Sequence, residues 1–147
     1  MEKSLNLDFE RFALPGKPAG QYAPLTLAYI GDAVYELVVR TVVTARHDVS
    51  VNRLNKRCAD LVKAVTQSKM AETLKPYFTE KEAEIYRRGR NAHSPTTPKN
   101  APVTDYRRAT GFEAVMGYLY LNGETDRMME LVEIALLEEG EGSGEGT

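Results

Sequence analysis

The stretch that decides the fold is LAYIGDAVYELVVR, residues 27–40. Pro24 suits a first helical turn, and apolar residues then recur at spacings of three and four, which predicts a largely buried helix over residues 24–45. Within this helix the carboxylate of Asp32 follows Gly31 directly. An unpaired charge is costly to bury, so we expect Asp32 to have a cation, a set of hydrogen-bond donors or a proton.

Helical patterns continue along the rest of the chain, and strand patterns are scarce. Ser50 is a plausible N-cap, Thr79 and Glu82 form a capping-box pattern, and Thr104 or Asp105 is expected to cap a later helix. Gly123 should end that helix. The sequence predicts an all-α fold with about six or seven helices, which span residues 24–45, 51 to about 65, about 67–74 as a continuation or a restart after a kink, 79 to about 90, 105–122 and 125–137.

Composition predicts one domain followed by a short tail. The chain has 147 residues, of which 42% are hydrophobic and 27% charged, enough to bury one core over residues 1–137. Residues 138–147, rich in Gly, Glu and Ser, are expected to be disordered. Cys58 is the one cysteine and should be a small core residue. With no signal-peptide pattern and with charges inside the longest apolar stretch, we expect a soluble cytoplasmic protein without a membrane span.

Charge is distributed unevenly along the chain. The formal net charge is −2, yet residues 85–108 are strongly basic and the residues beyond 123 are strongly acidic. A local basic patch attracts phosphates whatever the total charge, because screening confines each field. A solvated helix face is the alternative explanation.

A second carboxylate lies in a setting like that of Asp32. Glu113 follows Gly111 by two positions within an apolar segment. If the two helices face each other, the carboxylates would meet and repel unless a divalent cation lay between them, and oxygen ligands favour Mg²⁺ or Mn²⁺. The alternatives are a salt bridge from Asp32 to an arginine of another helix, and pairing of Glu113 with Arg108 or a helix end. Glu36 should pair with Arg40 and is a weaker candidate ligand.

Three segments together resemble a known family. LAYIGDAVYELVV resembles the signature helix of the ribonuclease III catalytic domain, and FEAVMGYLYLNG resembles its second acidic motif. The segments YIGDAVYE, RRGRNAHSPTTPKN and YRRATGFEAVMGYLYL are similar, in order and spacing, to the mini-ribonuclease III branch. The resemblance covers about residues 20–137.

The resemblance implies an all-helical homodimeric endoribonuclease that cleaves double-stranded RNA with Mg²⁺, or Mn²⁺ as a substitute, and leaves 5′-phosphate and 3′-hydroxyl ends. Asp32 and Glu113 map onto catalytic, metal-binding carboxylates, and the branch points to maturation of large-subunit (23S) precursor ribosomal RNA. Two positions depart from the larger relatives, where Ala28 and Thr110 replace acidic residues. We therefore expect more water and RNA phosphate in the metal shell.

No double-stranded-RNA-binding domain is expected here, so the catalytic domain itself should hold the RNA. Phosphates and 2′-hydroxyls of A-form RNA suit basic and small polar side chains. The candidate RNA-binding residues are Arg87, Arg88, Arg90, Asn91, Thr97, Lys99 and Asn100. A non-catalytic RNA-binding protein on the same fold is the competing function, for which Ala28 and Thr110 argue; a helical protein-interaction module is the third.

Overall fold

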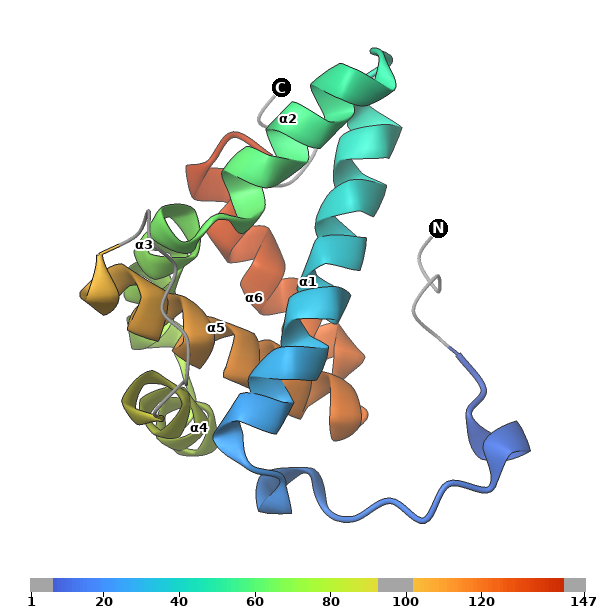
Figure 1. Cartoon of the computed structure of the whole chain (residues 1–147), viewed down its shortest axis with the longest axis vertical. Coiled ribbons are helices and arrows are strands. Elements are labelled where there is room, and N and C mark those ends of the chain that lie inside the picture. The colour runs from blue at the N-terminus through green and yellow to red at the C-terminus, as the bar shows by residue number, and fades with distance from the viewer. Residues whose placement is uncertain (1–6, 93–101, 142–147) are drawn as a thin grey trace.

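A computed structural model describes residues 7–92 and 102–141. Its helices are α1 (Pro24–Arg46), α2 (Val51–Val62), α3 (Ala64–Leu74), α4 (Glu80–Asn91), α5 (Val103–Leu121) and α6 (Thr125–Glu138), with short 3-10 turns at Glu10–Phe12, Ala19–Gln21 and Lys75–Tyr77. No strand occurs within these ranges, which confirms the all-α prediction. In Figure 1, α5 runs behind α1, and α3 and α4 lie beside α5. None of the helices in the described ranges is long and apolar enough to cross a membrane.

Several helix ends are the predicted ones. The Ser50 hydroxyl accepts a hydrogen bond from the backbone amide of Arg53. The amide of Glu82 donates to the Thr79 hydroxyl at 3.1 Å, and the amide of Thr79 donates to the Glu82 carboxylate at 2.9 Å, which completes the capping box. Gly123, with φ +73°, follows the end of α5. Such reciprocal bonds satisfy amides that a helix start leaves without partners.

The start of α5 differs from the prediction. The helix begins at Val103, and its N-cap is Pro102 without a side-chain hydrogen bond, so neither Thr104 nor Asp105 caps it. The Pro102 carbonyl accepts the first helical hydrogen bond, from the amide of Tyr106. Proline is favourable at the start of a helix because its fixed φ suits the entry of the chain and its missing amide is not needed there.

The region of residues 50–74 forms two helices that are separated at Lys63. Lys63 has an extended ψ of 155° between α2 and α3. The restart therefore occurs before residue 67. Cys58 is buried as predicted. The apolar periodicity also places Val51 and Val65 on the inner face, but both are exposed, because α2 buries only a narrow face and α3 begins on a new axis.

The predicted disorder from residue 138 is wrong for residues 138–141. Helix α6 includes Glu138, and Gly140 adopts φ +79° so that the amide of Glu141 donates to the Leu136 carbonyl. The Glu141 side chain is buried and contacts His47 Nε2 at 2.6 Å and Arg57 Nε at 3.3 Å. These contacts tie the end of α6 to the end of α1 and to α2. Residues 142–147 lie outside the described ranges.

Helix α5 crosses two neighbours at glycines. A Cβ added to Gly31 of α1 would lie 1.8 Å from the Glu113 carbonyl oxygen, and one added to Gly117 of α5 would lie 1.9 Å from the Leu27 carbonyl oxygen. Gly89 of α4 and Gly111 of α5 meet in the same way, with a Cβ on Gly89 2.9 Å from the Gly111 Cα. Backbone thus packs on backbone where α5 crosses α1 and α4.

We expect Gly117→Ala to destabilise the fold by about 3 kcal/mol or more, because a backbone carbonyl cannot move out of the way as a flexible side chain does. Gly20→Ala is the matched control: its Cβ would meet the end of the Lys81 side chain at 3.3 Å, and its effect should be within about 0.5 kcal/mol. Urea unfolding measures both. Equal stability of the two variants would contradict the proposed backbone contact.

Candidate active site

The α1–α5 crossing places Asp32 and Glu113 together. Asp32 directly follows Gly31, and the Glu113 carbonyl is the atom that approaches Gly31 most closely. Glu113 is half-buried, whereas Asp32 is exposed, so the predicted burial of Asp32 is wrong. One residue in a helix turns the side chain about 100° from its neighbour, so Gly31 faces α5 while Asp32 lies at the edge of the contact. The predicted meeting of the two carboxylates is confirmed.

The environment of Glu113 disfavours its charged form. Burial, the negative charge of Asp32 and a side-chain hydrogen bond with Asp32 together raise the pKa of Glu113 to about 8, against the opposing effect of a hydrogen bond from Gln67. Two carboxylates this close share a proton or need a cation between them.

The salt-bridge alternatives are not what the structure shows. Among residues 7–92 and 102–141, no basic side chain forms an ion pair with Asp32 or Glu113; Arg108 instead pairs with Glu72 at 3.1 Å. Arg40 pairs with Glu36 at 3.2 Å, as predicted. Glu36 is therefore already occupied by a cation of its own helix.

Gln67 of α3 is a site residue that the sequence analysis missed. It is 1% exposed, and its Nε2 donates to the Val62 carbonyl at 2.8 Å and lies 3.4 Å from Glu113 Oε2. Its Oε1 is buried without a hydrogen-bond partner among the described atoms. The sequence did contain a signal for Gln67. It precedes the apolar Met70 and Leu74 by helical spacings, which place its amide on the same inner face of α3.

The donor set fits a hard divalent cation that keeps much of its shell from outside the protein. Two carboxylates and a nearby amide supply only oxygen acceptors, as Mg²⁺ prefers. The two positions that differ from the larger relatives supply no metal ligand. Ala28 is buried without a polar side chain, and the Thr110 hydroxyl donates to the Tyr106 carbonyl. No group of three or more His, Cys, Asp or Glu suited to a metal occurs in the described part of the chain.

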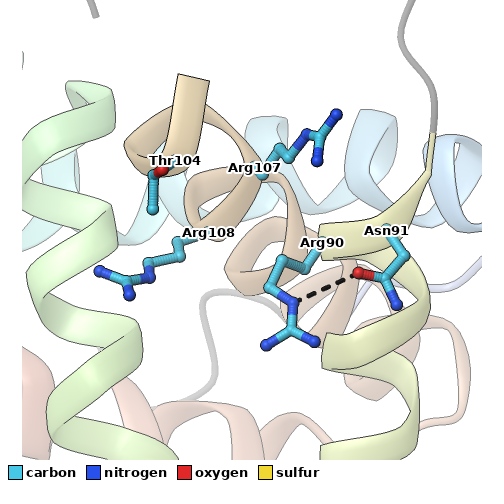
Figure 2. A pocket seen from close by; sticks show the side chains of 5 residues that line it. All are labelled: Arg90, Asn91, Thr104, Arg107 and Arg108. Carbon is cyan, nitrogen blue, oxygen red and sulfur yellow. Dashed lines mark hydrogen bonds between the residues drawn. The ribbon is translucent and has the colours of Figure 1, made fainter. Parts of the chain in front are cut away.

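The predicted RNA-binding residues of α4 lie at its C-terminal end. Arg90 and Asn91 line an open pocket of about 200 Å³ together with Thr104, Arg107 and Arg108 of α5, as Figure 2 shows. The pocket is therefore lined by three arginines. Arg87 is exposed, and half-buried Arg88 donates to the Gly20 carbonyl at 3.3 Å. Thr97, Lys99 and Asn100 lie outside the described residues.

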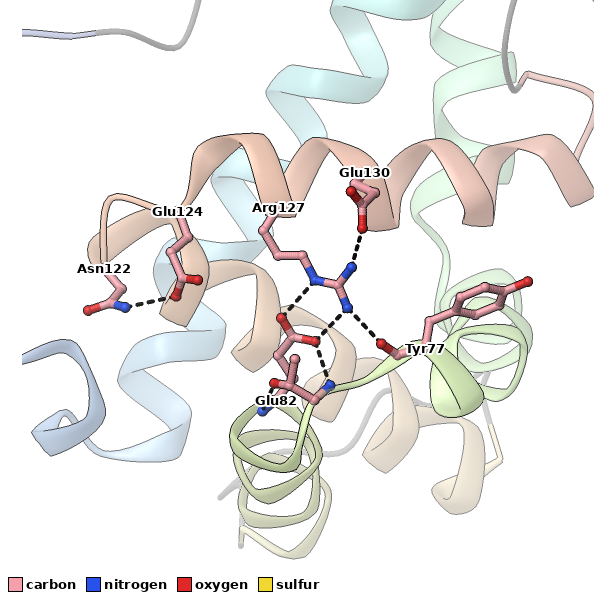
Figure 3. Close-up of polar contacts among 7 residues, drawn as sticks. Tyr77, Glu82, Asn122, Glu124, Arg127 and Glu130 are labelled. Atoms are coloured by element: carbon pink, nitrogen blue, oxygen red, sulfur yellow. Dashed lines mark hydrogen bonds and ion pairs between the residues drawn. The ribbon is translucent and has the colours of Figure 1, made fainter.

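The start of α4 is fixed by a partly buried ion pair, drawn in Figure 3. Arg127 of α6 donates from Nε and Nη2 to the two oxygens of Glu82, each at 3.0 Å, and from Nη2 to the Tyr77 carbonyl at 2.6 Å. Burial alone raises the pKa of Glu82, but hydrogen bonds from Arg127 and Thr79 outweigh it and lower that pKa below its usual value. The charged carboxylate thus anchors the helix that presents Arg90.

Comparison with known proteins agrees with this geometry. The ribonuclease III domain family matches residues 25–124. The mini-ribonuclease 3 of Clostridium tetani is 46% identical over 79% of this chain and 78% of its own length, and that of a Thermoanaerobacter species is 44% identical over 92% and 96%. A Fusobacterium nucleatum protein solved by X-ray crystallography superposes with a TM-score of 0.76 and 28% identity, covering 84% of this chain and 99% of its own.

Fold, carboxylate pair and relatives together define an endoribonuclease of the ribonuclease III type. The chain belongs to the ribonuclease III domain family and, within it, to the mini-ribonuclease III branch.

We expect Asp32→Asn to lower the pKa of Glu113 from about 8, because the substitution removes the neighbouring negative charge. Burial, the larger cause, should keep that pKa above the ordinary value. A pH titration of ¹³C-labelled glutamate carboxyls by NMR measures the shift. Glu36→Gln is the control and should leave the pKa of Glu113 unchanged. An unchanged pKa in Asp32→Asn would mean that the two carboxylates do not interact.

Proposed function

We propose that this protein is a Mg²⁺-dependent endoribonuclease that cleaves double-stranded RNA to 5′-phosphate and 3′-hydroxyl ends, with Asp32 and Glu113 as the catalytic metal ligands. The observation that carries the proposal is the carboxylate pair, which has no basic partner among the described residues. Mn²⁺ fits the same oxygen donors. The mini-ribonuclease 3 relatives support the substrate class.

The two carboxylates of the site differ in their exposure to solvent. Exposed Asp32 is accessible to a phosphate of a large duplex, while half-buried Glu113 is held by the packing of α5. Mg²⁺ bound there would supply an activated water for in-line attack and charge stabilisation for the leaving 3′-oxygen. Separation of Asp32 and Glu113 is set by the backbone contact at Gly31, so the ligands are preorganised.

The arginine-lined pocket supports RNA binding by the catalytic domain. Arg90 and Arg107 form no ion pair with an acidic residue of the described chain, so their charge is available to phosphates. Arg87 and Asn91 extend the same surface along α4. Thr97, Lys99 and Asn100 follow α4 and precede α5 in the sequence, and their contact with RNA stays a prediction from the sequence.

We further propose that the enzyme is a homodimer that pairs through the outer face of α1. Tyr29 is 81% exposed and Leu37 is 47% exposed, and with exposed Ala33 they form one apolar stripe at four-residue spacing. An exposed apolar stripe suits a self-complementary two-fold interface. A dimer supplies one Asp32–Glu113 site for each RNA strand.

The natural substrate that we propose is the precursor of large-subunit (23S) ribosomal RNA, in the cytoplasm. This proposal is supported by the membership of the mini-ribonuclease III branch and by a pocket whose charge suits a duplex rather than a small neutral substrate.

Asp32→Asn should reduce Mg²⁺-dependent cleavage of duplex RNA by about 100-fold or more, since loss of a direct ligand should exceed the 10- to 100-fold cost typical of residues that merely orient ligands. Gel analysis of end-labelled RNA with and without Mg²⁺ measures it. Glu36→Gln, one turn away, should retain cleavage. Full activity of Asp32→Asn would reject the assignment, and duplex binding by the wild type without any Mg²⁺-dependent product would favour the non-catalytic alternative.

Combined Arg90→Ala and Arg107→Ala should weaken duplex binding and reduce its salt dependence by about one unit of slope per arginine, because fewer counterions are released. Binding is measured in the Asp32→Asn background to prevent cleavage. Arg11→Ala, in the N-terminal segment, is the control for loss of an arginine away from the pocket. An unchanged slope would place the RNA surface elsewhere.

Leu37→Asp should convert the protein to a monomer at concentrations where the wild type is a dimer, because two charges would be buried at a two-fold interface. Sedimentation equilibrium measures the mass. Leu137→Asp changes a similarly exposed leucine of α6 and should leave the dimer intact. A Leu37→Asp protein that remains dimeric would exclude this face.

A further inference from the structure

The break between α2 and α3 is closed by side chains of the first turn of α3. The last carbonyls of a helix have no partner within it. Here the Thr66 hydroxyl donates to the Asp60 carbonyl at 2.6 Å, and Gln67 Nε2 donates to the Val62 carbonyl at 2.8 Å. Gln67 is therefore held at a fixed place, 1% exposed, beside α5.

The bond to Val62 determines which way the Gln67 amide faces. If the amide were turned over, its oxygen would oppose the Val62 carbonyl oxygen, so the nitrogen must stay on that side. The same nitrogen lies 3.4 Å from Glu113 Oε2. Its two hydrogens thus serve one backbone carbonyl and one carboxylate of the site.

The oxygen of the Gln67 amide is an unused acceptor within the described part of the chain. Gln67 Oε1 is buried and has no hydrogen-bond partner among the described atoms. Buried acceptors in native proteins nearly always have a partner, from the protein, an ordered water or a ligand shell. Because Oε1 belongs to the same amide group as Nε2, which contacts Glu113 Oε2, this unused acceptor lies close to the place where the proposed function requires a hydrated cation.

We propose that Gln67 is a positioning residue of the metal site, which orients the Glu113 carboxylate through Nε2 and accepts, through Oε1, a hydrogen bond from a water of the cation's shell. The inference rests on the proposed function. Second-shell partners of this kind fix ligand orientation and influence metal affinity. Gln67 would then partly compensate for the acidic side chains that Ala28 and Thr110 do not supply.

Gln67→Met tests the proposal, because it keeps the length of the side chain and removes both polar atoms. Mn²⁺ binding to the RNA-free protein, measured from the EPR signal of free Mn²⁺, should weaken about tenfold or more. The kcat for duplex RNA should fall while KM stays unchanged, since Gln67 does not reach the surface. Ser68→Ala, a buried neighbour on the same helix, should retain wild-type Mn²⁺ affinity.

A second measurement does not depend on whether Gln67→Met folds. In the wild-type protein, the side-chain amide resonances of Gln67 should shift on titration with Mg²⁺ and should not shift in Asp32→Asn. Wild-type Mn²⁺ affinity of Gln67→Met, or Gln67 resonances that ignore Mg²⁺ in a wild type that binds it, would overturn the inference alone. Retained cleavage by Asp32→Asn would instead overturn the proposed function.

Discussion

The contact on which the structure depends is the backbone-on-backbone crossing of α1 and α5. Gly31 and Gly117 each face a carbonyl that leaves no room for a Cβ. The close approach buries the middle of α5, including Phe112 and Met116, and seats Phe112 edge-on against Tyr35 with ring centroids 5.0 Å apart. It also brings together two carboxylates that are far apart in the chain. The crossing of α1 and α5 therefore determines both the packing of the core and the geometry of the site.

The carboxylate pair is electrostatically unfavourable by itself. Burial and the charge of Asp32 both raise the pKa of Glu113, and among the residues that the structure describes the opposing contact is a long hydrogen bond from Gln67. Stable helices can maintain such a site because the rest of the core supplies the free energy that the site loses. A cation between the two carboxylates would relieve the repulsion.

Two other ion pairs fix the elements around this centre. Arg127 joins α6 to the start of α4 through Glu82, and the buried Glu141 joins the end of α6 to His47 and Arg57. Arg127 is a basic residue within the acidic C-terminal part of the chain, whereas Glu141 lies in the segment that composition assigns to a solvated tail. The first supports the helix that carries the arginine pocket; the second closes the far end of α1.

The sequence alone determined that the chain is helical and that Ser50 and Thr79 cap two of its helices, because apolar periodicity and capping act over a few residues. The two acidic motifs were identified by the family resemblance. Family resemblance then paired Asp32 with Glu113. Tertiary structure decided that Asp32 is exposed, that Gln67 lies against Glu113, and that Glu138 to Glu141 are ordered. Each of these depends on where one helix axis passes another, and no local pattern specifies a crossing between residues 80 positions apart.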